Sequence, residues 1–234
     1  MKIILAETAG FCFGVKRAVD MVYELCDEGK KVCTLGPIIH NAQLVADLEQ
    51  KGVRVVEEVS EVHDGEILVI RSHGVPEAVM TTAKELNVQT VDATCPFVAK
   101  IHKIVKEASN SGEIILIAGD PNHKEVIGIV GHCDSEVFVF EDEHSLENLL
   151  KNNSKLTTEK VCVVAQTTFN VQEWRKSSDF AKKVYTNLII FDINEEKILK
   201  LPIQLRAQKI AYLSQNRQVP DITVERMVLH GRAV

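Results

Sequence analysis

Side chains that ligate metals, carry protons or bind anions recur in short segments rich in glycine and proline. These segments are AGFCFG with Cys12, GPIIHN with His40, RSHGVP with His73, DATCPF with Cys95, GDPNHKE with His123 and Glu125, and AQTTFN with Thr167. Taken singly, a histidine in a turn is usually an ordinary polar residue, and a lone cysteine is usually a small apolar one. Six segments of one kind are harder to explain in that way, so we expect their side chains to form one site.

The segment around Cys12 leaves the role of its thiol open. Two phenylalanines and two glycines surround this cysteine, just before a stretch of helical period that starts at Gly14. A thiol in such a setting is a small apolar filler, a nucleophile, a disulfide partner or a metal ligand, and the flanking residues alone do not choose. Lys16 and Arg17 follow, and they are expected either on a solvated helix face or beside an anion at the helix start.

The composition is that of a globular protein with an acidic balance. The 234 residues carry a net charge of -6, which argues against nucleic acid or an anionic membrane surface as the main partner. The apolar run at the N-terminus is too short for a signal peptide, and no window approaches the roughly 18 apolar residues of a membrane span. We therefore expect a cytoplasmic protein without nucleic-acid or membrane partners.

Six cysteines in a cytoplasmic chain are expected to be reduced thiols or metal ligands rather than members of disulfides. None lies in a CxxC pair, which excludes a zinc ribbon and a thioredoxin motif. Cys26, Cys33, Cys133 and Cys162 lie within predicted helices or strands or near a helix end, so we expect them to be structural.

Short runs of isoleucine and valine alternate with stretches of helical period. Strands are predicted over residues 2–7, 31–35, 53–56, 66–70, 88–93, 113–120, 136–141, 159–166 and 187–193, and helices over 14–29, 76–87, 96–110 and 170–185. This alternation is typical of a parallel sheet covered by helices on both faces. Ligands of such sheets bind beyond the carboxyl ends of the strands, where the six segments are expected.

The two cysteine segments resemble each other. IILAETAGFCFG and VQTVDATCPFVAK both contain a strand, an acidic residue, small residues, a cysteine and then a helix. Two thiolates placed by two such units favour an iron–sulfur cluster or a zinc site, although two cysteines complete neither.

Taken together, AGFCFGVKRAV, GPIIHN, IRSHGVP, DATCPFV, GDPNHKEV and VVAQTTFNV resemble the consecutive signatures of the 4-hydroxy-3-methylbut-2-enyl diphosphate reductases, the LytB-type enzymes, over residues 1–191. The resemblance implies an α/β protein built as a trefoil of small parallel-sheet domains with pseudo-threefold symmetry. It also implies a central [4Fe-4S] cluster that is held by one cysteine from each domain. The domains expected here are 1–95 and 96–191.

The resemblance also implies roles for single residues. Cys12 and Cys95 are similar to two of the three cluster ligands, and His40, His73 and His123 to the donors that bind the substrate diphosphate. Glu125 is similar to the acid that protonates the leaving hydroxyl, with Thr167 as its hydrogen-bonded relay. The implied reaction is the reductive dehydroxylation of 4-hydroxy-3-methylbut-2-enyl diphosphate to isopentenyl and dimethylallyl diphosphate, the last step of the non-mevalonate isoprenoid pathway. Ferredoxin or flavodoxin is the implied electron donor.

Residues 192–234 depart from the motif pattern. No cysteine follows Cys162, and aligning Asp192 with Asp92 places Glu195 where the third thiolate is expected. Residues 192–234 hold 7 basic and 5 acidic residues, against 20 and 28 in residues 1–191. We therefore expect an atypical tail in place of the start of the third domain. The alternative hypothesis is a truncated or frameshifted, inactive remnant that binds metal through two thiolates.

Overall fold

The computed structural model describes residues 11–39, 41–184 and 188–190. The chain divides into two compact units, residues 1–13 with 192–234 and residues 14–191. Apart from the first residue of α1, every element described below belongs to the unit of residues 14–191. Predictions for residues 2–7, His40 and the tail with Glu195 lie outside the described residues.

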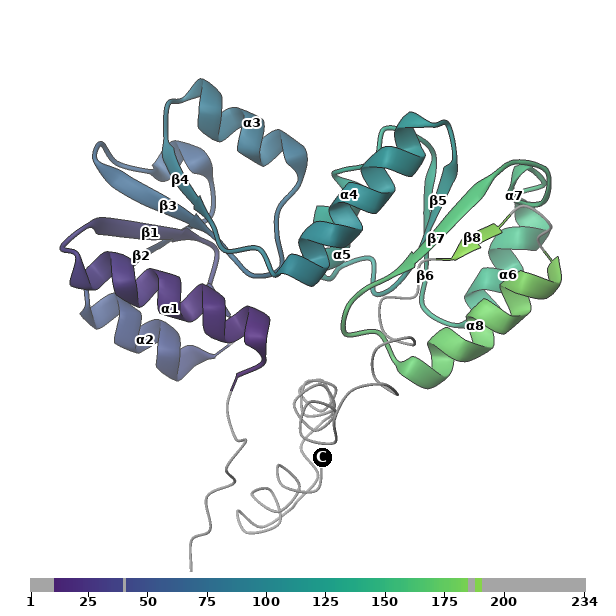
Figure 1. Ribbon diagram of the computed structural model, residues 1–234, viewed down its shortest axis with the longest axis horizontal. Helices are drawn as coiled ribbons and strands as arrows, with labels where there is room; N and C mark the ends of the chain where they lie inside the picture. Colours follow the sequence, from purple (N-terminus) through teal and green to yellow (C-terminus); the bar gives the residue numbers. More distant parts are fainter. Residues whose placement is uncertain (1–10, 40, 185–187, 191–234) are drawn as a thin grey trace, which may run out of the picture. The chain divides into compact units, whose positions relative to one another are not determined.

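The first sheet is wholly parallel and has the strand order β2-β1-β3-β4 (Figure 1). Its elements are α1 (Phe13–Asp27), β1 (Lys31–Leu35), α2 (Ala42–Gln50), β2 (Arg54–Val56), the 3-10 turn η1 (Val59–Glu61), β3 (Glu66–Ile70), α3 (Glu77–Glu85) and β4 (Gln89–Asp92). β3 is buried along its whole length, which explains why its sequence EILVI is almost continuously apolar.

The second sheet repeats this arrangement with the order β6-β5-β7-β8. Its elements are α4 (Pro96–Asn110), β5 (Ile114–Ala118), α5 (Lys124–Val130), β6 (Val137–Phe140), α6 (Glu143–Asn152), α7 (Lys155–Thr158), β7 (Val161–Ala165), α8 (Val171–Val184) and β8 (Leu188–Ile190). β1 thus corresponds to β5, and β3 to β7. The predicted α/β fold class with repeated small parallel sheets is confirmed.

Helices cover both faces of each sheet, as Figure 1 shows. On the first sheet, α1 and α2 pack with Val32 and Val69 on one face, while α3 packs with Cys33 and Leu68 on the other. On the second sheet, α6 and α8 share a core with Leu116, and α4 and α5 lie on the opposite face (Figure 1). The alternation of these neighbours along each strand is the period of two that side chains follow in a sheet.

The four helices predicted from the sequence are confirmed as α1, α3, α4 and α8. Strand predictions that fall on the described residues are also confirmed. α2, α5, α6 and α7 were not predicted from the sequence. α5 and α7 have seven and four residues, and two turns or less of apolar period is too short to stand out from a loop.

Contacts join the turn after β3 to the elements of the second sheet. We call the elements of the first sheet (residues 13–92) the first repeat and those of the second sheet (residues 96–190) the second repeat. Glu77 donates its backbone N–H to the Gly131 carbonyl at 3.2 Å. Lys106 of α4 bonds to the carboxylates of Glu77 at 2.8 Å and Asp134 at 2.7 Å. His132 bonds through Nε2 to the Val75 carbonyl at 3.1 Å. The turn that carries His73 is therefore braced by the second repeat.

No helix within the described ranges is both long and apolar enough to cross a membrane. The cytoplasmic location stays a prediction.

Gly131 is expected to be intolerant of a side chain. A Cβ at this position would lie 2.4 Å from Cβ and 2.7 Å from Cα of Pro76, so the backbone would have to move. The Gly131 backbone has ordinary right-handed helical angles, so the effect is steric. Gly131→Ala is expected to lower the free energy of unfolding by about 1–3 kcal/mol, measured by urea denaturation.

Gly128→Ala is the matched control. Its Cβ would meet nothing closer than 3.5 Å, and alanine favours the helix by about 0.5–1 kcal/mol. Equal stability changes for the two variants would contradict the packing argument.

Candidate active site

Four of the predicted site segments directly follow the carboxyl ends of strands that the structure describes. The turns with His73, Cys95, His123 and Thr167 come after β3, β4, β5 and β7 and precede helices. All these strands are parallel within their sheets, so the turns of one sheet leave it at the same edge.

Glu125 is the most deeply placed of the candidate residues. It lies in the first turn of α5 and is fully buried, although carboxylates are almost never buried without partners. Its partner is Thr167, 42 residues away in the turn after β7. The Thr167 backbone N–H donates to Oε1 at 2.6 Å, and the Thr167 hydroxyl donates to Oε2 at 2.8 Å. The two residues are therefore hydrogen-bonded to each other, and the relay role stays a prediction.

Burial and hydrogen bonding act on the Glu125 carboxyl in opposite directions. Burial raises the pKa of Glu125, the two hydrogen bonds from Thr167 lower it by a smaller amount, and the net result is a pKa of about 7. A carboxyl with a pKa near neutral pH exchanges its proton readily there, as a general acid requires. When Glu125 is protonated, its O–H can donate to the Thr167 hydroxyl oxygen instead.

His123 caps the helix that carries Glu125. Its Nδ1 accepts the backbone N–H of Glu125 at 3.1 Å, in the manner of an N-cap residue. Because Nδ1 acts as the acceptor, the proton of the neutral ring is on Nε2. His123 therefore offers an N–H donor at the N-terminal end of α5.

His73 lies beside His123. The two ring centroids are 5.5 Å apart, with the planes inclined by 75° in an edge arrangement. The structure thus brings together two of the three predicted diphosphate-binding histidines from the two repeats. The third, His40, lies outside the described residues.

Cys95 is the N-cap of α4, and Pro96 occupies the first helical position. Its backbone N–H donates to the Ser72 carbonyl at 2.9 Å, which ties this turn to the one that carries His73. A Cβ on Gly14 would lie 2.6 Å from the Cys95 sulfur. Glycine at this position therefore lets the start of α1 pack closely against the thiol.

The helix after Cys12 also contacts the Cys95 turn. Arg17 of α1 donates to the Thr94 carbonyl at 3.2 Å, so a fully solvated position for Arg17 is wrong. Lys16 pairs with Asp20 on the exposed side of the helix, in agreement with the prediction that Lys16 lies on a solvated helix face. Cys12 itself is half-buried and directly precedes α1.

The other cysteines are placed as structural thiols. Burial raises the pKa of Cys33 to about 11 and that of Cys162 to about 12, and both lie within strands. The pKa of Cys133 is raised to about 11 for the same reason. These groups stay protonated at neutral pH. In the part of the chain that the structure describes, no group of three or more potential ligands could hold a metal ion.

Three further residues lie near the site but were not among the predicted site residues. Arg71 and Gln166 are the first residues after β3 and β7 and turn toward neighbouring turns. His102 of α4 is buried and stacks on His132 with a centroid separation of 4.1 Å. Arg71 lies in the segment RSHGVP and Gln166 in AQTTFN, and their polar side chains were the only feature of the sequence that could have indicated a role.

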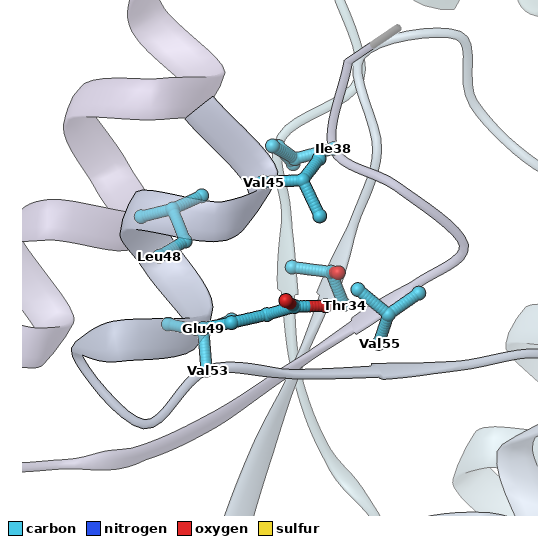
Figure 2. A pocket seen from close by; sticks show the side chains of 7 residues that line it. All are labelled: Thr34, Ile38, Val45, Leu48, Glu49, Val53 and Val55. Carbon is cyan, nitrogen blue, oxygen red and sulfur yellow. The ribbon is translucent and has the colours of Figure 1, made fainter. Parts of the chain in front are cut away.

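Two hollows lie away from these turns. One of about 10 Å³, room for at most one water molecule, lies in the core between β1, α2 and β2 (Figure 2). Its lining residues are Thr34, Ile38, Val45, Leu48, Glu49, Val53 and Val55. The other, of about 420 Å³, lies where β3 and β4 begin, between residues 59–66 and 86–89. Neither belongs to the edge that holds the candidate site.

The chain is similar in sequence to known proteins. The chain is 43% identical over 199 residues to the 4-hydroxy-3-methylbut-2-enyl diphosphate reductase of Thermoanaerobacter sp. (strain X514), covering 82% of this chain and 66% of that relative. It is 42% identical over 192 residues to the enzyme of the same name from Clostridioides difficile (strain 630), covering 80% and 67%. The chain thus spans about two thirds of the length of these relatives.

Solved structures are similar to the chain as well. The E-1-hydroxy-2-methyl-but-2-enyl-4-diphosphate reductase from Plasmodium falciparum matches with a TM-score of 0.71 and 29% identity, over 80% of this chain and 58% of that one. A structure of (E)-4-hydroxy-3-methyl-but-2-enyl diphosphate reductase, described as the terminal enzyme of the non-mevalonate pathway, matches with a TM-score of 0.75 and 31% identity. That match covers 99% of this chain and 82% of the other.

The model of the LytB protein family matches residues 3–219, which is most of the chain. The match continues past residue 191, where the sequence motifs end. The chain therefore belongs to the LytB family.

Proposed function

We propose that this chain carries the acid–base and diphosphate-binding part of a 4-hydroxy-3-methylbut-2-enyl diphosphate reductase. The reaction is a reductive dehydroxylation that yields isopentenyl and dimethylallyl diphosphate. The observation that carries the proposal is the buried Glu125, held by Thr167 and placed two residues after His123. The names of the relatives support the substrate and the reaction. Residues 1–95 and 96–191 are proposed as its first two repeats.

A [4Fe-4S] cluster is proposed as the cofactor, with Cys12 and Cys95 as two of its ligands. The position of Cys95 fits such a group, because Cys95 is the N-cap of α4, and the N-terminal end of a helix favours an anionic sulfur. Thiolates are the protein ligands that iron–sulfur clusters use. When bound, the cluster would supply single electrons and a Lewis-acidic iron for the substrate hydroxyl.

The chain's own residues bind the substrate at its diphosphate. His123 offers its Nε2 proton, since Nδ1 is occupied by the Glu125 backbone N–H. His73, whose ring lies beside that of His123, is the second donor. His40 is proposed as the third. Imidazole donors together with helix N-terminal N–H groups suit a small multivalent anion.

Glu125 delivers a proton. In its neutral form the buried carboxyl can protonate the departing hydroxyl, so that it leaves as water rather than as hydroxide. Thr167 holds the carboxylate that remains through the bonds to both oxygens and relays a proton back. The reaction consumes two electrons and two protons, breaks one C–O bond and releases one water. Ferredoxin or flavodoxin is proposed as the electron source.

Cluster binding is the first test. Anaerobic reconstitution with iron and sulfide is expected to give a brown protein, measured by its visible absorbance and by iron and sulfide analysis. Cys12→Ser and Cys95→Ser are each expected to abolish the colour. Cys26→Ser on α1 is the matched control, because this half-buried thiol lies outside the turns, and it is expected to keep full colour. A wild-type protein that stays colourless and takes up no iron would refute the cofactor and favour the inactive remnant.

The Glu125 carboxyl is expected to make stability depend on pH. Its pKa is about 7 in the folded chain, against 4.5 for a solvent-exposed glutamate carboxyl. The folded state therefore binds the proton more tightly. The resulting stabilisation is complete below pH 4.5 and is lost as the pH rises through 7, and a shift of this size corresponds to about 3 kcal/mol. Urea unfolding of the wild type and of Glu125→Gln from pH 4.5 to 8 measures it.

The difference in unfolding free energy between these two proteins is expected to change by up to about 3 kcal/mol across this range, in favour of Glu125→Gln at high pH. Glu107→Gln, an exposed change on α4, is the control and is expected to give a nearly constant difference. A constant difference for Glu125→Gln as well would contradict the raised pKa. In the cluster-loaded protein, Glu125→Gln is expected to keep the colour and lose turnover, and retained turnover would refute the proton-donor role.

A further inference from the structure

Arg71 lies where the turns of the first sheet part. In the order β2-β1-β3-β4, the chain leaves β1 toward β2 on one side and leaves β3 toward β4 on the other. Ligands of open parallel sheets bind at this reversal of strand order, outside the carboxyl ends of the strands. Arg71 is the first residue after β3 and precedes His73 by two positions.

The Arg71 side chain closes over the end of the neighbouring strand. Its Nη1 donates to the carbonyl of Leu35, the last residue of β1, at 2.9 Å. A Cβ on Gly36 would lie 2.7 Å from the same nitrogen. The guanidinium therefore fixes the turn that starts at Gly36 against the turn that carries His73.

The second sheet shows that this task needs no charge. Gln166 is the first residue after β7, as Arg71 is after β3. Its Oε1 accepts the Asp120 backbone N–H at 3.2 Å, and a Cβ on Gly119 would lie 2.9 Å from that oxygen. Its Nε2 donates to the Thr168 hydroxyl at 2.7 Å. A neutral amide thus fixes the equivalent turn with both of its polar atoms bonded.

The charge of Arg71, in contrast, is left without a close counterion. Its Nε is buried and has no hydrogen-bond partner, and within the described ranges no carboxylate lies at ion-pair distance from the guanidinium. Glu57 acts on it only at longer range and raises its pKa, while burial lowers the pKa. A partly buried cation without a counterion is unfavourable in the free protein and attracts an anion.

We propose that Arg71 supplies a fixed positive charge for the diphosphate of the substrate, at the edge of the first sheet beside His73. This inference rests on the proposed function and adds a binding residue to it. Near neutral pH a histidine with an ordinary pKa carries only part of a charge, whereas an arginine is always charged. One permanent cation is therefore a substantial share of the charge available to a multivalent anion.

The test is a calorimetric titration of the full chain with inorganic pyrophosphate at neutral pH, which measures the dissociation constant. Arg71→Gln places a glutamine after β3, as Gln166 stands after β7, so the turn that starts at Gly36 is expected to keep its position. This variant is expected to weaken pyrophosphate binding about tenfold, as the loss of a charge-assisted bond does. Arg71→Lys keeps the charge and is expected to stay within about threefold of the wild type.

Lys151→Gln is the matched control, because it removes one positive charge from an exposed site on α6. It is expected to leave the affinity unchanged. The dependence of affinity on salt is a second readout, and Arg71→Gln is expected to weaken it, which loss of packing alone would not do. If Arg71→Gln fails to fold in urea titrations, Arg71→Met replaces it, since methionine also lacks the charge.

Three results would overturn the inference. They are wild-type affinity in Arg71→Gln, an equal loss in Arg71→Lys and Arg71→Gln, and no pyrophosphate binding by the wild type. None of them bears on cluster assembly or on the Glu125 titration, so a failure here is distinct from a failure of the proposed reaction.

Discussion

Parallel pairing of the central strands decides which turns can meet. β5 and β7 run side by side in register from Ile114 with Val161 to Ala118 with Ala165, so their turns begin at the same level. Glu125 follows one strand and Thr167 the other, and they can bond only because both turns leave the sheet at the same edge. An antiparallel pair would send these turns to opposite edges. The proposed acid–base pair is therefore a consequence of strand direction as much as of residue type.

The same constraint sets the electrostatics of the site. α5 starts only a few residues after β5, so its first turn lies against the core, and Glu125 is buried there with Val126. Burial alone would raise the pKa of the carboxyl further, and the two bonds from Thr167 hold it near neutral. His123 serves both the fold and the site, because capping α5 through Nδ1 fixes which nitrogen carries the proton. Structure and chemistry thus share one small set of hydrogen bonds.

The sequence predicted the sheets well and the contacts poorly, for physical reasons. Strands such as EILVI are buried on both faces, and their apolar runs are bounded by glycine and proline, so they stand out. α5 does not, because seven residues contain too little of the helical period. The roles of Glu125 and Thr167 came from a family resemblance, since no local pattern pairs residues 42 apart. Nor does a sequence show which way Arg71 turns, since that depends on a carbonyl left free at the end of β1.

The two repeats use one topology for different chemistry. At the reversal of strand order the first sheet has Arg71 and the second has Gln166, and both residues fix a glycine turn. Because the neutral side chain is sufficient for that purpose, the charge in the first sheet needs another explanation. Two residues further along, the first repeat has His73, and the second has Thr168, next to Thr167, the proposed relay residue. The first repeat is therefore suited to hold an anion and the second to move a proton. A substrate with a diphosphate at one end and a leaving hydroxyl at the other requires both.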